Sequence, residues 1–454
     1  MDEKQLYDEF LSIINESHPG LTFEEYRDCC IFLLFYQYLC LKYDKELEDQ
    51  YKLGEMVRLA VRGKLQMPSF LRFMENASGF LHLNCPQFNL MEASFLKKVS
   101  EIKLSEKKKS YARFIRKLIK KVDRFECDEL LLKDYPDLFR KLIIEFSRMK
   151  KSTYISETVL KLFEMFFQDS GREERKIFLP EFQYGILLES VSKKCKKPEI
   201  YGYDNNIEYI ELLRIYAYMT GLTEDQVHLF REEEWEKADD LENQFDVIAV
   251  YQPEGVEDGI LLSSAEPLKE KDLLTSKSKG EFPYLLSALP LLKEDGALVA
   301  VLPSALLYRE GKEQQIRKIL VDELGCLDTV MLLPDSLFQS VGQDEVLMYL
   351  KKGRNRSETM FFDCAKYDFE EDGFPKIEKA WRDGETIPGL CSKVEVETIR
   401  ENDYNLNLPR YIMQTKKSIT VDVAAKRRRI QEIDQELQEI EGKISMYRRD
   451  LGGL

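Results

Sequence analysis

The chain has 454 residues, of which 44% are hydrophobic, and a formal net charge of −15 at pH 7. This length fits two or three domains of ordinary size, and the apolar content excludes a chain that is disordered throughout. A uniformly acidic surface repels a phosphate backbone, so any contact with nucleic acid requires a locally basic face.

Nine cysteines are present, and no two are spaced as Cys-x-x-Cys. An odd count without that spacing argues against a zinc site or a disulfide framework and favours reduced thiols. The first residues are acidic, unlike a secretory leader, and the most apolar run, residues 29–41, is too short to cross a bilayer. The sequence therefore predicts a cytoplasmic protein with no bound metal and no membrane contact.

Residues 1–150 are expected to form an all-helical N-terminal domain, because apolar residues recur at helical spacing and Gly and Pro are sparse. Within it, residues 101–125 hold ten basic and three acidic residues, a net charge of +7. Such a run is either the solvated face of a helix or a patch that faces phosphates. The candidates for DNA contact are Lys107, Lys108, Lys109, Arg113, Arg116, Lys117, Lys120 and Lys121.

Short β-branched and aromatic runs alternate with helical patterns across residues 151–368. This alternation predicts an α/β, Rossmann-like domain with a mainly parallel, doubly wound sheet. Ligands bind such sheets at the carboxyl ends of strands near the reversal of strand order, so the loops after Phe178, Tyr203 and Val250 are expected to form the site. The predicted strands cover residues 176–178, 199–203, 227–230, 246–250, 297–302, 329–333 and 346–351.

Two segments follow the predicted sheet. Residues 369–420 contain scattered Gly and Pro and are expected to form an irregular C-terminal extension. Residues 421–454 are predicted to form a coiled-coil helix, whose narrow apolar stripe needs a partner helix from this chain or from another protein. Its seam consists of Ile430, Ile433, Leu437, Ile440, Ile444, Tyr447 and Leu451.

The loops after the first two strands differ in how well they suit a nucleoside cofactor. Asp204 directly follows the second strand, where an acid holds ribose hydroxyls, although Asp is also a common helix N-cap. The loop after the first strand keeps one glycine, Gly185. Gln183 and Tyr184 place side chains where a ligand would need bare backbone. One of the two cofactor-binding features is therefore present, and the other is nearly absent.

Taken together, these segments resemble the modification subunits of type I restriction-modification systems, which are N6-adenine DNA methyltransferases. The likeness covers nearly the whole chain, and its motifs occur in the family's order. It implies a catalytic domain that binds S-adenosylmethionine, between a helical N-domain and a C-terminal partner helix. The motifs are residues 153–156, 200–206, 282–307 with Val301-Leu302-Pro303, 316–317, 332–334 with Phe338, and 404–407 with 410–411.

The chain departs from the family at both motifs that carry chemistry. The cofactor motif Asp-Pro-x-Cys-Gly-Ser-Gly-Gly falls on residues 179–186, and the catalytic motif Asn-Pro-Pro-aromatic falls on residues 251–254. In the family, the Asn carboxamide and a Pro carbonyl accept hydrogen bonds from the adenine amine, and the aromatic ring stacks on the flipped base. The resemblance thus implies a degenerate catalytic site at Tyr251, Gln252, Pro253 and Glu254. It implies a degenerate cofactor site at Asp204, Pro180 and Gly185, with Leu179, Gln183 and Tyr184.

Residues 229–258 hold eleven acidic and two basic residues, a net charge of −9. We expect them to form an acidic rim beside the altered catalytic loop, which disfavours entry of DNA.

The sequence therefore indicates a catalytically inactive methyltransferase subunit that acts as a scaffold or DNA clamp in a defence complex. It is expected to bind no cofactor tightly, and S-adenosylmethionine only if the site survives. By resemblance, its N-domain and C-terminal helix contact a sequence-specificity subunit or a second methyltransferase subunit, and double-stranded DNA is a further candidate partner. Two alternatives stay open: an active N6-adenine methyltransferase with divergent motifs, and a regulatory protein without a role on DNA.

Overall fold

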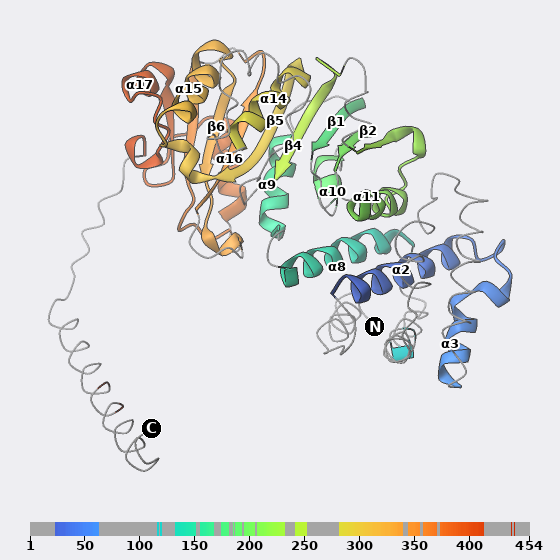
Figure 1. Cartoon of the computed structure of the whole chain (residues 1–454). Helices are drawn as coiled ribbons and strands as arrows, with labels where there is room; N and C mark the ends of the chain where they lie inside the picture. Colours follow the sequence, from blue (N-terminus) through green and yellow to red (C-terminus); the bar gives the residue numbers. More distant parts are fainter. Residues whose placement is uncertain are drawn as a thin grey trace, which may run out of the picture. The chain divides into compact units, whose positions relative to one another are not determined.

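The computed structural model describes most of two regions, a helical segment near the N-terminus and the sheet that follows it (Figure 1). The described residues are 23–62, 116–117, 119, 132–150, 155–167, 174–180, 185, 187–192, 195–204, 207–231, 241–251, 281–338, 344–354, 357–369, 373–412, 437 and 440.

The helical segment contains α2 (Phe23–Lys42), α3 (Leu53–Val61) and α8 (Tyr135–Lys150), with short 3-10 turns η1 (Asp49–Tyr51) and η3 (Leu132–Asp134). Helix α2 lies beside α8 (Figure 1). Every residue of α2 from Leu33 to Cys40 is buried, as expected for a helix that is apolar nearly all round. Among the described helices, none is both long and apolar enough to cross a membrane.

Nine strands form one sheet in the order β3-β2-β1-β4-β5-β7-β6-β8-β9. The pairs β5–β7, β6–β7 and β8–β9 are antiparallel, and the other pairs are parallel. The mainly parallel sheet and all seven predicted strands are confirmed, and β8 and β9 were not predicted. The bounds are β1 Glu174–Pro180, β2 Lys197–Tyr203, β3 Val227–Phe230, β4 Phe245–Tyr251, β5 Leu292–Pro303, β6 Leu327–Leu332, β7 Glu345–Lys351, β8 Glu358–Asp363 and β9 Cys391–Glu395.

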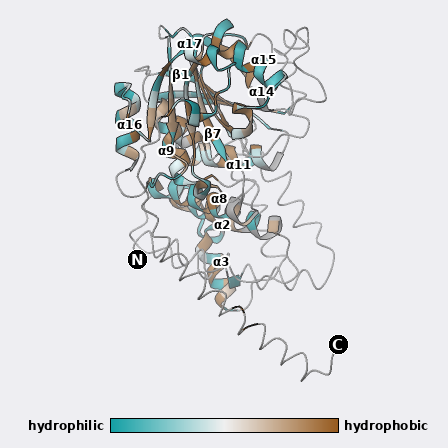
Figure 2. Cartoon of the chain, turned by 90° about the vertical axis from the view of Figure 1, so that its left-hand side faces the viewer, coloured by the Kyte–Doolittle hydropathy of each residue, from teal (hydrophilic) through white to brown (hydrophobic). Residues whose placement is uncertain are grey.

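Helices cover both faces of the sheet, which confirms the doubly wound arrangement. Buried residues of α9 (Glu157–Phe167), α10 (Leu187–Ser192), α11 (Ile207–Met219) and α16 (Gly373–Asp383) share one apolar cluster with the strands. Residues of α14 (Glu281–Ala288), α15 (Lys312–Lys318) and α17 (Val396–Glu401) share the cluster on the opposite face. In Figure 2 the hydrophobic colour gathers on the strands between these helices.

The apolar cluster of the α9–α11 face continues without a break into the helical segment. The Phe139 ring of α8 stacks on the Tyr216 ring of α11 with their centroids 5.6 Å apart. Tyr43, just past α2, shares a 2.6 Å hydrogen bond between its hydroxyl and that of Tyr218. The helical segment is therefore joined to the sheet by packed aromatic side chains, and a domain boundary at residue 150 remains a prediction.

Residues 373–412 are more regular than we expected. The prediction of an irregular extension is wrong for this part, because it contains α16, β9, α17 and the turn η11 (Leu408–Arg410). Strand β9 extends the sheet by pairing with β8. The chain divides into compact units at residues 412 and 413, and in the second unit only Leu437 and Ile440 are described. Both are helical, and 51% and 52% of their surfaces are exposed.

Candidate functional site

The strand order reverses at β1, which lies between β2 and β4. Both neighbours run parallel to β1, so the three carboxyl ends meet at one edge of the sheet. They place Pro180, Tyr203 and Tyr251 at this edge, with Asp204 one residue further on. This is the position where open α/β sheets bind ligands, and the predicted cofactor and catalytic positions converge there.

Asp204 is held at this edge by its own backbone. It is 6% exposed, and its N–H donates a 3.2 Å hydrogen bond to the carbonyl of Phe230 at the end of β3. Of the residues that match the family's cofactor motifs, it is the one with the chemistry to hold ribose hydroxyls. The loop residues 205 and 206 lie outside the described part of the chain.

Gly185, the single glycine kept in the cofactor loop, is needed for packing. Its φ is +71°, a left-handed conformation that glycine adopts without strain. A Cβ placed there would lie 2.4 Å from Cδ1 of Leu213 on α11. The space on the Cβ side of its Cα is thus filled by Leu213, so a residue with a side chain would not fit here without movement of Leu213. Gln183 and Tyr184 lie outside the described residues.

Tyr251, at the position of the family's catalytic Asn, belongs to the core. It ends β4 directly beside Val301 of β5, and its side chain is 4% exposed. It shares an apolar cluster with Leu179 of β1, which is fully buried. At this end of β4 the Tyr251 side chain therefore contributes to the apolar core. Gln252, Pro253 and Glu254 fall outside the described ranges.

One acidic residue of the expected rim lies elsewhere. We placed Asp246 beside the catalytic loop, but it lies near the amino end of β4, at the opposite edge of the sheet. It is buried there, and its Oδ2 accepts hydrogen bonds from Lys293 Nζ at 2.8 Å and from the backbone N–H of Lys176 at 2.9 Å. Asp246 therefore pins β1, β4 and β5 together and adds no charge to the rim.

Three other aspartates lie at the carboxyl edge of the sheet, and they were not among the site residues predicted from the sequence. Asp335 follows β6, Asp363 ends β8, and Asp344 precedes the antiparallel β7. Burial raises the pKa of Asp344, and the carboxylates of Asp335 and Asp363 raise it further. The sequence signal that could have identified these three aspartates is their position next to the ends of strands. In the described residues no group of His, Cys, Asp and Glu is arranged to hold a metal ion.

A hollow of about 540 Å³ opens at the amino ends of the strands, on the far edge from Asp204. Two ion pairs lie in its lining, Glu174 with Lys197 at 2.8 Å and Asp246 with Lys293 at 2.8 Å. Because it lies at the opposite edge of the sheet, it is not the predicted cofactor site.

Of the candidates for DNA contact, the structure describes Arg116 and Lys117. Both are helical; Lys117 is exposed and Arg116 half-buried, while Ile119 nearby is fully buried. The basic stretch thus has a buried side here and a charged side. The described ranges leave out Lys107, Lys108, Lys109, Arg113, Lys120 and Lys121.

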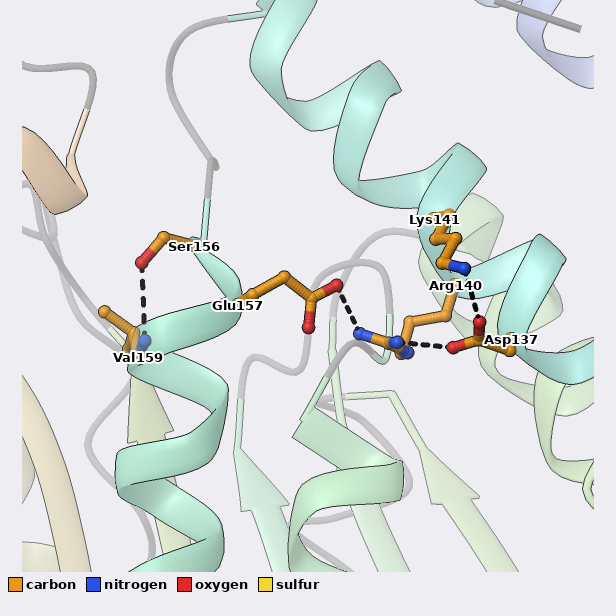
Figure 3. Close-up of polar contacts among 6 residues, drawn as sticks. All are labelled: Asp137, Arg140, Lys141, Ser156, Glu157 and Val159. Atoms are coloured by element: carbon orange, nitrogen blue, oxygen red, sulfur yellow. Dashed lines mark hydrogen bonds and ion pairs between the residues drawn. The ribbon is translucent and has the colours of Figure 1, made fainter. Parts of the chain in front are cut away.

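The junction between α8 and α9 is held by polar contacts (Figure 3). Arg140 lies between Asp137 of its own helix and Glu157 of α9, whose Oε1 accepts a 2.7 Å hydrogen bond. Ser156 caps α9, because its Oγ accepts a 3.3 Å hydrogen bond from the N–H of Val159. The family-like residues 153–156 therefore end in a helix cap, which is a structural role.

Comparisons with known proteins agree with this architecture. The N-6 DNA Methylase family matches residues 180–419, just over half of the chain. A type I restriction enzyme MpnII methylase subunit from Mycoplasma pneumoniae is 28% identical over 48% of this chain and 43% of its own length. The MjaVII methylase subunit of Methanocaldococcus jannaschii is 30% identical over 32% of this chain and 28% of its own length. The matches thus span less than half of each curated relative.

Solved structures show the same fold. A type I restriction-modification methyltransferase subunit from Streptococcus thermophilus superposes with a TM-score of 0.75 at 20% identity, over 91% of this chain and 100% of that one. A chain from a study of type I restriction-modification complex assembly superposes with a TM-score of 0.59 at 15% identity, over 97% and 98% of the two chains. At these identities the likeness concerns the fold alone.

Proposed function

The chain belongs to the N-6 DNA methylase family, and on that premise we propose that it is a catalytically inactive subunit of a restriction-modification complex. In this proposal it serves as a scaffold or DNA clamp, and another subunit supplies the chemistry.

The observation that carries the proposal is that Tyr251 stands at the position of the family's catalytic Asn and is buried. The family uses an Asn at this position to accept a hydrogen bond from the amine of a flipped adenine, and removal of one such preorganised contact costs about 100- to 1000-fold in rate. A tyrosine has no carboxamide, and this one is buried beside Val301. Glu254 replaces the stacking ring and brings a negative charge to the same loop.

The cofactor loop supports the same reading. The resemblance implies S-adenosylmethionine, which would use Asp204 for its ribose and a glycine-lined loop for its methionine part. Asp204 fits this role, but the space beside Gly185 is occupied by Leu213. We propose that the chain binds S-adenosylmethionine weakly or not at all.

The proposed scaffold role rests on the C-terminal seam. Leu437 and Ile440 are seam positions of the predicted coiled coil, and each exposes about half of its surface. An amphipathic helix gains stability when a partner covers such residues. We propose that a specificity subunit or a second methyltransferase-type subunit covers this seam, and that the basic stretch with Lys117 contacts the DNA backbone.

Transfer of a radiolabelled methyl group from S-adenosylmethionine to DNA tests the first part of the proposal. The purified chain should show no turnover, whereas turnover that disappears in Asp204→Ala would identify an active enzyme. A pull-down by a specificity subunit tests the second part. Removal of residues 421–454 should abolish capture of the chain, and undiminished capture would contradict a scaffold role for this segment.

A further inference from the structure

Arg317 occupies an unusual environment at the start of the route to the C-terminal unit. It lies on α15 and is 1% exposed. Its guanidinium donates to three uncharged backbone carbonyls from two segments of the chain: Tyr404 at 2.6 Å, and Leu306 at 2.7 Å and Arg309 at 2.8 Å in the turn after β5. Burial lowers the pKa of Arg317 to about 10. Burial of a charged guanidinium costs free energy, and this cost must be offset by a structural or functional gain.

The segment that Arg317 holds is strained. Asp403 and Tyr404 have φ angles of +54° and +56°, and a left-handed conformation costs a residue other than glycine about 1–2 kcal/mol. Two such residues in a row persist only where surrounding contacts over-determine them. Besides Arg317, Gln314 Nε2 donates 3.0 Å to the carbonyl of Asp403, and the Tyr404 hydroxyl donates to Asp322.

Two residues after Tyr404, the backbone is hydrogen-bonded to the carboxyl edge of the sheet. The N–H of Leu406 donates a 2.8 Å hydrogen bond to the carbonyl of Leu307, which lies in the turn directly after β5. Strand β5 is the neighbour of β4 at the level of Tyr251. Residues 403–406 are therefore fastened to the turn beside the altered catalytic position, a few residues before the first compact unit ends at Ile412.

We propose that Arg317 is a positioning residue whose clasp on residues 403–406 fixes the point from which the chain continues into its partner-binding tail. This inference rests on the proposed scaffold role. A C-terminal segment that recruits a partner benefits when the chain that leads into it starts from a rigid point beside the sheet. In this proposal the motif Tyr404-Asn405-Leu406-Asn407 has a structural role and not a chemical one. It forms the strained turn that the hydrogen bonds from Arg317 hold in place.

Amide hydrogen exchange on the full-length chain tests the clasp directly. In Arg317→Met three carbonyls, one buried and two part-buried, lose their donor. Exchange at residues 404–412 should therefore accelerate by about tenfold or more while β5 and β7 stay protected. Arg317→Lys keeps a cation with three donors and should restore part of the protection. Arg382→Met, on an exposed arginine of α16, is the matched control and should change nothing. Unchanged exchange in a folded Arg317→Met chain would overturn the clasp.

A second readout tests positioning apart from local stability. A fluorophore introduced at position 418 should show lower residual anisotropy in Arg317→Met than in the parent chain, with partial recovery in Arg317→Lys. Faster exchange without a change in anisotropy would show that the clasp does not set the origin of the tail, which would also overturn the proposal. Neither measurement uses a partner, so failure of the scaffold proposal would appear separately, as undiminished capture by the specificity subunit after removal of residues 421–454. If Arg317→Met fails to fold, Arg317→Lys replaces it, because it removes the forked donors that reach the Tyr404, Leu306 and Arg309 carbonyls and keeps the cation. Unchanged exchange at residues 404–412 in Arg317→Lys would then overturn the clasp.

Discussion

Tyr251 lies directly beside Val301 in the parallel register of β4 and β5, at the carboxyl edge of the sheet, and yet it is 4% exposed. The position that carries the family's chemistry is thus packed as core. Reversion to the family's residue should consequently damage the fold before it restores any reaction.

Tyr251→Asn tests this directly. Truncation of a large buried ring typically costs about 3–5 kcal/mol of unfolding free energy, and the polar carboxamide would be left in an apolar cluster. Tyr251→Phe keeps the ring and should cost about 1 kcal/mol. Urea unfolding of both variants measures the difference. A Tyr251→Asn chain as stable as the parent would show that the side chain is not part of the core.

Gly185→Ala should destabilise the chain through two separable effects. The left-handed φ alone costs about 1–2 kcal/mol, and contact with Leu213 adds to it. Gly221→Ala is the matched control, because Gly221 has a φ of +87° and nothing within 4 Å of the added Cβ. We expect a larger loss of unfolding free energy for Gly185→Ala than for Gly221→Ala. Equal losses would mean that Leu213 does not hold this glycine, and the cofactor loop would regain its functional interpretation.

How far the sequence predicts this architecture depends on the residues concerned. The strands β4, β5 and β7 lie in the interior of the sheet, and each contains an uninterrupted apolar run, residues 247–251, 297–302 and 346–350, so their residue types predict them. Strands β8 and β9 lie toward one end, and β9 reads Cys-Ser-Lys-Val-Glu, which alternates too weakly to be recognised. The sequence therefore did not predict β9, which pairing with β8 makes a strand.

Within the site, the sequence located Asp204 and Tyr251 but not their environments. Asp246 is five residues from Tyr251 along the chain, yet an extended strand separates them by about 3.3 Å per residue and places them at opposite edges of the sheet. Gly185 is explained only by Leu213, and that contact joins residues far apart in the sequence. The clasp of Arg317 was equally hidden, because its acceptors are backbone carbonyls, which residue types do not reveal.

The ion-pair network at the α8–α9 junction predicts a pH dependence of stability. Lys141 and Arg140 lower the pKa of Asp137 to about 2, despite an opposing effect of burial, from an unperturbed value of 3.8. A lowered folded-state pKa stabilises the fold above the unfolded value, and this contribution is lost as the pH falls from about 4 through about 2. Because Asp137 is 36% exposed, solvent screens the pair and the effect is smaller than the shift implies.

Asp137→Asn removes this contribution. Urea unfolding of the parent and the variant should differ by a constant amount above about pH 4, and the two curves should converge as the pH approaches 2. Parallel curves down to pH 2 would show that the carboxylate gains nothing from Arg140 and Lys141.

The tail should tolerate polar substitutions without loss of fold in the first compact unit. Leu437→Asp with Ile440→Asp places charges on the predicted seam and should weaken capture by a specificity subunit by about tenfold or more, because a buried unpaired charge is costly. Gln438→Asp, which lies off the seam, is the control and should leave capture unchanged. Thermal unfolding should be the same in all three chains. Capture that survives the double substitution would contradict a coiled-coil contact through these residues.

The most direct test of the central claim is methyl transfer from S-adenosylmethionine to unmethylated DNA, by the purified chain alone and together with a specificity subunit. We expect no turnover above background that depends on this chain's own edge residues, so Asp204→Ala should change nothing. Turnover by the parent chain that is lost in a folded Asp204→Ala variant would contradict the account and establish an active methyltransferase.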